Sequence, residues 1–195
     1  EGAKRGKKTS MWLAVQNVKE KKSDIVISAG NTGALLVISK LNLKMIDNID
    51  KPALSALWPN KKGMSVVLDL GANIECSPKN LIDFSIMGSS LFKSLYPDDN
   101  AKVALLNIGS EAIKGNEIIK ETYQQLSLRN NSDFEFKGYI EGNHLMNGDV
   151  NVIVADGFTG NVALKTAEGT ASFITSELKK AMTGNLIGKI SSLLN

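Results

Sequence analysis

The chain has 195 residues, of which 43% are hydrophobic and 22% charged, and its formal net charge is +3. This composition is typical of a folded globular domain and excludes a disordered chain, while a single cysteine excludes a disulfide framework. The small positive charge does not indicate nucleic-acid binding, and no apolar run reaches the roughly 18 residues that a membrane-spanning helix requires.

Apolar β-branched runs alternate with amphipathic helical stretches at spacings typical of βα units. In chain order, the pattern predicts a helix at 11–21, a strand at 24–28, a helix at 32–44, strands at 53–58 and 64–69, a helix at 78–95, a strand at 103–108, a helix at 116–128, strands at 134–139 and 150–155, and a helix at 160–182. Several strands are continuous apolar runs, as in strands buried on both faces of a sheet. The sequence therefore predicts a three-layer α/β fold, with a mostly parallel sheet and helices on both of its faces.

The helix predicted at 78–95 has a well-defined start, because Ser77 is a good N-cap and Pro78 suits the first turn. Four apolar residues and one glycine, which permits close packing, fall on one face of this helix: Leu81, Phe84, Gly88, Leu91 and Leu95.

No linker or low-complexity tract divides the chain, so we expect one α/β domain over residues 1–195. The chain opens without methionine and stops on an apolar pattern at Leu193 and Leu194, and we therefore expect an excerpt of a longer protein. We expect no secretory signal and a cytoplasmic location.

Four hydrophobic runs end in loops rich in glycine and asparagine, at 28–33, 69–73, 107–117 and 156–161. Glycine lets the backbone approach a ligand closely, and asparagine offers a neutral amide with two donor hydrogens. Loops that follow parallel strands converge at the carboxyl edge of the sheet, where open α/β folds bind ligands. The four loops together predict a site for an anion or a polarised carbonyl group.

The common signatures of dinucleotide, phosphate-loop, serine-hydrolase and zinc sites are absent from the sequence. We therefore predict no metal and no cofactor. With one cysteine and one histidine, a nucleophile pair is possible only between Cys76 and His144, and local structural roles are the alternative for both.

Lys114 follows a predicted strand end and precedes Gly115 and Asn116, where a helix is predicted to begin. A lysine at this place adds a full positive charge to the partial charge of the helix N-terminus, and this combination suits phosphate or a developing oxyanion. The alternative is a solvated surface lysine.

Asparagines in the other loops have two possible roles. Asn161 could cap the helix predicted at 160–182, or its amide could bind a thioester or phosphate oxygen. The same choice between cap and ligand donor applies to Asn31, which precedes Thr32, and to Asn73, which follows Gly71.

The tail at 178–195 alternates apolar residues with Lys179, Lys180 and Lys189. A basic amphipathic segment of this kind packs on a core, pairs with another subunit or lies in a membrane interface. The sequence leaves these three alternatives open.

The loops, in this order, resemble those of the bacterial acyl-ACP:phosphate acyltransferases, the PlsX family of phospholipid synthesis, where ACP is the acyl carrier protein. The matching stretches cover almost the whole chain and lie at 7–11, 28–35, 49–53, 68–78, 86–89, 105–109, 114–117 and 156–166. The family's first strands and its C-terminal region have no counterpart in these residues.

The resemblance implies that inorganic phosphate attacks the thioester of a long-chain acyl-ACP, giving acyl phosphate and free ACP. It also implies a fold similar to phosphate acetyltransferases and the isopropylmalate-dehydrogenase group, in a cytoplasmic homodimer that associates peripherally with the membrane. We expect the tail at 178–195 to make that membrane contact or the dimer contact.

The resemblance places the family's implicated lysine on Lys114 and its implicated asparagine on Asn161. Phosphate is already an anionic nucleophile, so our hypothesis is that Lys114 offsets negative charge while Asn161 orients the carbonyl or the phosphate. Ten further residues are predicted to bind substrate: Asn31, Thr32, Gly33, Gly71, Asn73, Gly115, Asn116, Asp156, Thr159 and Gly160.

Two other functions remain open from the sequence. The chain could belong to a phosphate acetyltransferase-like enzyme that uses a coenzyme A thioester. It could also be a non-catalytic module that docks ACP or the membrane.

Overall fold

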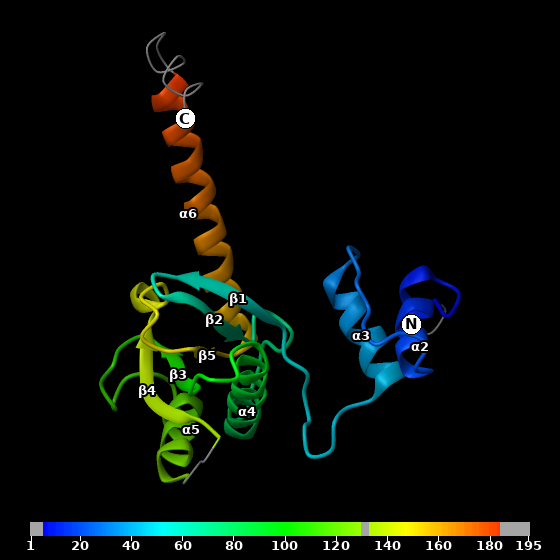
Figure 1. Ribbon diagram of the computed structural model, residues 1–195. Helices are drawn as coiled ribbons and strands as arrows, with labels where there is room; N and C mark the ends of the chain where they lie inside the picture. Colours follow the sequence, from blue (N-terminus) through cyan, green and yellow to red (C-terminus); the bar gives the residue numbers. More distant parts are fainter. Residues whose placement is uncertain (1–5, 130–132, 184–195) are drawn as a thin grey trace.

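A computed structural model describes residues 6–129 and 133–183. Its sheet has five strands in the order β1-β2-β5-β3-β4, of which β1 is antiparallel to β2 and the remaining neighbours are parallel (Figure 1). The strands are β1 (Ser55–Asn60), β2 (Gly63–Leu68), β3 (Lys102–Asn107), β4 (Glu135–Glu141) and β5 (Val152–Val154). The mostly parallel sheet predicted from the sequence is confirmed.

The helices described by the structure are α2 (Ser10–Lys19), α3 (Thr32–Leu43), α4 (Pro78–Leu95), α5 (Glu117–Leu128) and α6 (Gly157–Thr183), with a short 3-10 helix η1 (Gly142–His144) after β4. Each predicted helix is present, and its ends lie within a few residues of the predicted ones. None of the helices within the described ranges has the length and apolarity that crossing a membrane requires.

Two hydrophobic layers cover the two faces of the sheet. On one face, α4 and α5 pack over the strands and bury Phe84 and Phe92 against Val103 and Val152. On the other face, η1 and the first turns of α6 lie over Ile153, and this layer includes Trp58, Leu145 and Leu164. The prediction of helices on both faces is therefore confirmed.

Helix α4 begins as its sequence predicts, and the first part of its predicted apolar face is buried. Leu81, Phe84 and Gly88 are buried, whereas Leu91 and Leu95, at the end of the helix, are 38% and 45% exposed. The Ser77 hydroxyl accepts a hydrogen bond from the Asn80 N–H at 3.3 Å, and the Asn80 side chain accepts one from the Ser77 N–H at 3.0 Å. A side chain at Gly88 would place its Cβ 2.6 Å from Val152 Cγ1, so the glycine lets α4 lie close to the sheet.

The strand predicted at 24–28 is wrong. These residues form no regular structure and pair with none of the described strands, and Ile25 and Ile27 are 73% and 89% exposed. A run of apolar β-branched residues forms a strand only where a neighbouring backbone completes the hydrogen-bond ladder. The segment instead joins α2 to α3, which pack on each other to one side of the sheet (Figure 1).

Helix α6 starts three residues before its predicted start, because Asp156 rather than Asn161 caps it. The Asp156 carboxylate accepts hydrogen bonds from the Thr159 N–H and the Thr159 hydroxyl, both at 2.8 Å. The capping role considered for Asn161 is therefore wrong, since this residue lies inside the helix. Most of the predicted tail, residues 184–195, lies outside the described residues.

Candidate active site at the carboxyl edge of the sheet

Three loops leave the sheet at the carboxyl ends of the neighbouring parallel strands β2, β5 and β3. Val154 pairs with Leu68 on one side and with Leu105 on the other, so β2 and β5 end at the same level and β3 extends two residues further, to Asn107. The loop after β2 touches the start of α6, where the Gly157 N–H donates to the Asn73 carbonyl oxygen at 2.7 Å. The convergence expected from the strand pattern is present for these loops.

Asp69 organises the loop that follows β2. Its buried carboxylate accepts hydrogen bonds from the N–H groups of Gly71, Ala72 and Asn73, at 3.1, 2.9 and 2.8 Å. It also accepts one from the Leu54 N–H at 3.0 Å, and so fastens the loop to the chain entering β1. The sequence analysis assigned no role to Asp69. The available signal was that an aspartate side chain often accepts a hydrogen bond from the backbone two residues further on, as Asp69 does from Gly71.

The side-chain amide of Asn73 stabilises the loop that contains it. Its Nδ2 atom donates to the Pro52 carbonyl oxygen and to the Asp69 carboxylate, both at 2.7 Å. Both amide hydrogens are thus engaged within the protein, and the side chain holds the loop in shape.

Asn161 comes from the second turn of α6 and meets the loop after β2. Its Nδ2 atom donates to the Leu70 carbonyl oxygen at 3.1 Å. Gly71 has a φ of 131°, and a Cβ at this position would lie 2.7 Å from the Asn161 amide nitrogen. A Cβ on Gly160 would collide with the backbone carbonyl of Asp69. Glycine at both positions therefore lets α6 reach the loop and fixes the Asn161 amide.

A cavity of about 470 Å³ lies between α3, this loop and α6, and we call it the α3–α6 cavity. Thr32, Gly33, Gly71, Asn161 and Lys165 provide its polar lining. Five leucines provide most of its apolar lining: Leu35, Leu36, Leu54, Leu70 and Leu164. This cavity combines hydrogen-bonding groups with an apolar wall, which suits a ligand with a polar head and a hydrocarbon chain.

A second cavity, of about 290 Å³, lies beside the start of α5 and contains Asn116, Asp156 and Thr159 in its wall. Asn116 caps α5, since its side-chain oxygen accepts a hydrogen bond from the Ile119 N–H at 2.9 Å. Asn31 caps α3 in the same way, accepting from the Ala34 N–H at 2.9 Å. For both asparagines, the capping interaction is present in the structure.

Cys76 also lines this second cavity, and its surroundings oppose a nucleophilic role. Burial, with a smaller contribution from the nearby Asp69 carboxylate, raises the pKa of the Cys76 thiol. The neutral thiol is a weak nucleophile. His144 is the last residue of η1, and its chain neighbours Asn143 and Leu145 line a different cavity along α6. These positions favour structural roles for both residues.

Lys114 is exposed on the loop that follows β3, and it lines neither of the two cavities described above. The buried Asn107 holds this loop, because its Nδ2 atom donates to the carbonyl oxygens of Gly109 and Lys114 at 3.1 and 3.2 Å. Gly115, with a φ of 93°, leaves space that the Asn107 amide occupies. The loop therefore has a defined shape next to the capped start of α5.

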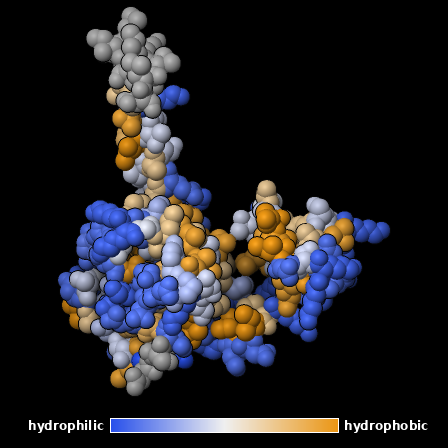
Figure 2. Space-filling model, viewed as in Figure 1, coloured by the Kyte–Doolittle hydropathy of each residue, from blue (hydrophilic) through white to orange (hydrophobic). Residues whose placement is uncertain are grey.

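The projecting part of α6 carries large apolar side chains that the domain does not cover (Figures 1 and 2). Phe173, Ile174, Leu178 and Met182 are all exposed, although they belong to a regular helix. Apolar residues gathered on an exposed helix mark an interaction surface.

Comparisons with known proteins place these features in context. A family model described as "Fatty acid synthesis protein" matches residues 1–195. The chain is 92% identical over 195 residues to a "Phosphate acyltransferase" of Pelagibacter ubique (strain HTCC1062), and the match covers 100% of this chain and 59% of that protein. It is 43% identical over 192 residues to a "Phosphate acyltransferase" of Maricaulis maris (strain MCS10), covering 98% of this chain and 54% of that protein. The chain thus spans somewhat over half the length of these relatives.

The fold is similar to two solved phosphotransacetylases. The EutD phosphotransacetylase from Staphylococcus aureus matches with a TM-score of 0.62 at 16% identity, over 83% of this chain and 56% of that one. A phosphotransacetylase from Streptococcus pyogenes matches with a TM-score of 0.63 at 16% identity, over 83% of this chain and 55% of that one. At this level of identity, the similarity extends to the fold, which is the α/β class predicted from the sequence.

Proposed function

Because this chain belongs to the fatty acid synthesis protein family, we propose that it forms part of a phosphate acyltransferase that converts long-chain acyl-ACP and inorganic phosphate into acyl phosphate and free ACP. In this reaction, a phosphate oxygen forms a bond to the thioester carbonyl carbon and the carbon–sulfur bond breaks. The thiolate of the carrier leaves and takes up a proton. The product would enter glycerophospholipid synthesis.

The observation that carries the proposal is the shape and lining of the α3–α6 cavity. Its five leucines suit a hydrocarbon chain, while Asn161 and Thr32 supply polar groups beside the glycine loop. A cavity of about 470 Å³ is much larger than an acetyl group requires, and this favours a long acyl chain over the acetate unit of a phosphate acetyltransferase.

Within this proposal, Asn161 orients the thioester carbonyl or the phosphate. Its hydrogen bond to the Leu70 carbonyl oxygen fixes the plane of the amide before substrate arrives. A fixed donor lowers the barrier because it needs no reorganisation when charge develops on the carbonyl oxygen. Asp69 and Asn73 act as positioning residues, since they shape the loop against which Asn161 rests.

Lys114 supplies positive charge to the phosphate or to the oxyanion. Support for this role comes from its loop, which leaves β3 next to β5 and ends at the N-terminus of α5. Four further residues would complete the phosphate side of the site. One is Gly115 in the Lys114 loop, and the others lie around the second cavity: Asn116, Asp156 and Thr159.

We further propose a cytoplasmic homodimer that contacts the membrane peripherally. Support comes from the exposed apolar side chains on the projecting part of α6, together with the basic amphipathic pattern of residues 178–195.

The proposal is tested by incubating the full-length protein with palmitoyl-ACP and phosphate, and measuring the free carrier thiol and the acyl phosphate formed. We expect release of the thiol that depends on phosphate. Parallel reactions with acetyl-CoA separate the phosphate acetyltransferase alternative, for which acetyl-CoA would be the better substrate. A protein that binds ACP but releases no thiol with either substrate would instead be a docking module.

A further inference from the structure

The hairpin formed by α2 and α3, residues 6–44, is the basic part of an otherwise acidic chain. It carries seven lysines against two acidic residues, whereas residues 45–195 carry 14 basic against 17 acidic residues. Within the described ranges, Lys22 pairs with Glu20 at 2.6 Å, and the other six lysines of the hairpin form no ion pair. The hairpin therefore presents uncompensated positive charge.

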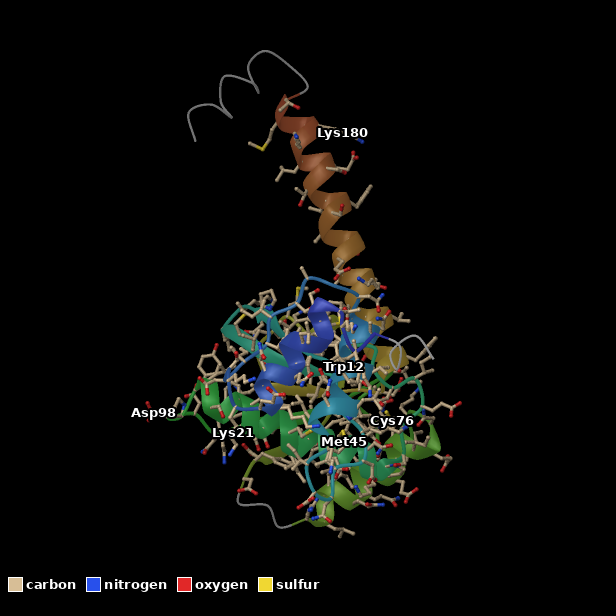
Figure 3. The ribbon with its side chains drawn as sticks, turned by 90° about the vertical axis from the view of Figure 1, so that its right-hand side faces the viewer. Trp12, Lys21, Met45, Cys76, Asp98 and Lys180 are labelled. Atoms are coloured by element: carbon tan, nitrogen blue, oxygen red, sulfur yellow. The ribbon has the colours of Figure 1, made fainter. Side chains whose placement is uncertain are left out.

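A cavity of about 320 Å³ opens on this basic hairpin, lined by Lys7, Trp12, Gln16, Lys19, Glu20 and Asn42. Trp12 is in the first turn of α2, and Lys21 lies just beyond the other end of that helix (Figure 3). Glu20 is the acidic group of the lining, and its oxygens accept hydrogen bonds from Gln16 and Lys22, each at 2.6 Å. Its charge is thus already offset by a lysine outside the cavity.

Asn42 provides independent support for a ligand. The residue is 6% exposed, and its side-chain Nδ2 atom has no hydrogen-bond partner among the described residues. A buried donor without a partner is unfavourable unless something else accepts its hydrogen bond. Together with two lysines, this donor is suited to an oxyanion such as a carboxylate.

The location of this cavity relates it to the substrate site. Thr32, at the start of α3, lines the α3–α6 cavity, and Asn42, in the last turn of the same helix, lines the basic cavity. At 1.5 Å per residue, the two positions lie about 15 Å apart along the helix. A protein held at the basic hairpin is therefore within reach of the acyl site through a flexible arm.

We propose that the basic hairpin docks an acidic protein partner, with one carboxylate of that partner seated between Lys7, Lys19 and Asn42. This inference rests on the proposed function, in which the partner is the carrier protein that delivers the acyl group through its prosthetic arm. Long-range attraction by the lysines speeds the encounter with the acidic partner. The hydrogen bond from Asn42 then fixes the position in which that partner binds.

Binding of holo-ACP to the full-length protein, measured by titration calorimetry, tests the proposal. We expect the double variant Lys7→Glu/Lys19→Glu to bind at least about tenfold more weakly, because two attractive charges become repulsive. The matched control is Lys61→Glu/Lys102→Glu, which makes the same charge change at exposed lysines outside the hairpin and should bind as the unaltered protein does. Added salt should weaken binding of the unaltered protein more than binding of the Lys7→Glu/Lys19→Glu variant.

A second variant, Asn42→Leu, separates docking from folding. It removes the unpartnered donor while keeping the side-chain volume similar, so we expect weaker ACP binding without a lower midpoint of thermal unfolding. Equal ACP affinity in all variants, or no ACP binding by the unaltered protein, would overturn the docking proposal.

Two further measurements distinguish failure of the docking proposal from failure of the proposed function. The first is binding of the protein to vesicles that contain phosphatidylglycerol. If the Lys7→Glu/Lys19→Glu variant loses vesicle binding but keeps ACP binding, the partner of the hairpin is a lipid surface. Phosphate-dependent thiol release by the unaltered protein is measured separately. If release occurs and ACP binding is insensitive to the hairpin, only the docking proposal fails, whereas absence of release rejects the proposed function.

Discussion

Asp69 has the largest structural effect that we assign to a single residue. Its carboxylate accepts five hydrogen bonds, four from backbone N–H groups and one from the Asn73 amide. A carboxylate only accepts hydrogen bonds, which matches a site where each neighbour is a donor. The geometry around Asn161 therefore depends on a residue that need not touch substrate.

Replacing Asp69 by asparagine should destabilise the protein by about 2–4 kcal/mol, because one accepting oxygen becomes an NH2 group that faces donors. The measurement is urea unfolding of the full-length protein. Asp98→Asn is the control, since Asp98 is exposed in the turn after α4 (Figure 3). Equal stability of the two variants would contradict the role given to Asp69.

Lys114→Ala and Asn161→Ala should each lower kcat for acyl phosphate formation by about 100- to 1000-fold, the typical effect of removing one well-placed donor. Their unfolding midpoints should change little, because both side chains are exposed. The control is Lys102→Ala, because Lys102 is exposed and lines neither the α3–α6 cavity nor the cavity beside α5. Near-normal turnover by both variants would reject the catalytic assignment.

Cys76 gives the site region a dependence on pH. Burial raises the pKa of its thiol above the ordinary value of 9.0, so the folded state resists forming the thiolate more than the unfolded state does. The free energy of unfolding should therefore fall as the pH rises above about 9, through the range between the two pKa values. Chemical unfolding at pH 8 and pH 10 checks this: the Cys76→Ala variant should lose less stability over that interval, and an equal loss would contradict the assignment.

At the scale of elements, α3 and α6 both contribute to the wall of the α3–α6 cavity. Helix α3 contributes Leu35 and Leu36, and α6 contributes Leu164 together with Asn161. Under the proposed function, the acyl chain and its carbonyl would lie in one space to which both helices contribute side chains.

Enlarging a side chain in that wall should shorten the acyl chain that the protein accepts. Leu36→Trp places extra volume in the cavity, and we expect turnover of palmitoyl-ACP to fall by about tenfold or more relative to octanoyl-ACP, since overpacking costs 1–3 kcal/mol. Leu41→Trp, on an exposed part of the same helix, controls for the larger residue. An unchanged chain-length profile in the Leu36 variant would place the acyl chain elsewhere.

At the scale of the whole molecule, the chain combines a compact sheet domain with two projecting parts of different chemistry. The α2–α3 hairpin is basic, and the outer half of α6 carries exposed apolar side chains, among them Phe173, Ile174 and Leu178. The two surfaces suit different partners, since positive charge attracts acidic proteins or lipids while apolar side chains drive burial against another subunit.

A charge placed on the exposed apolar side chains of α6 should weaken the proposed homodimer. We expect Phe173→Glu/Leu178→Glu to raise the dimer dissociation constant of the full-length protein by at least about tenfold, because burying an unpaired carboxylate is costly. Sedimentation equilibrium measures the constant. Ser176→Glu adds a charge at an exposed polar position of the same helix and should leave the dimer largely intact. Unaltered association in the double variant would exclude this surface from the interface.

The sequence by itself determined the helices, the mostly parallel sheet and the convergence of the three glycine loops that follow β2, β3 and β5. These features follow from local patterns: Ser77 and Pro78 specify the start of α4, and continuous apolar runs specify strands buried on both faces. Sequence reasoning failed at 24–28, because a strand exists only where another backbone pairs with it, and pairing is not a local property.

Only the tertiary structure decided which of the site residues act on one another. The sequence left Asn31, Asn73 and Asn161 with the same choice between capping and ligand binding. The structure makes Asn31 a cap, engages Asn73 within its loop, and brings Asn161 to the α3–α6 cavity. The reason is geometric: an amide becomes a cap, a brace or a cavity wall according to the neighbours that folding brings to it, and those neighbours lie up to 91 residues away in the chain.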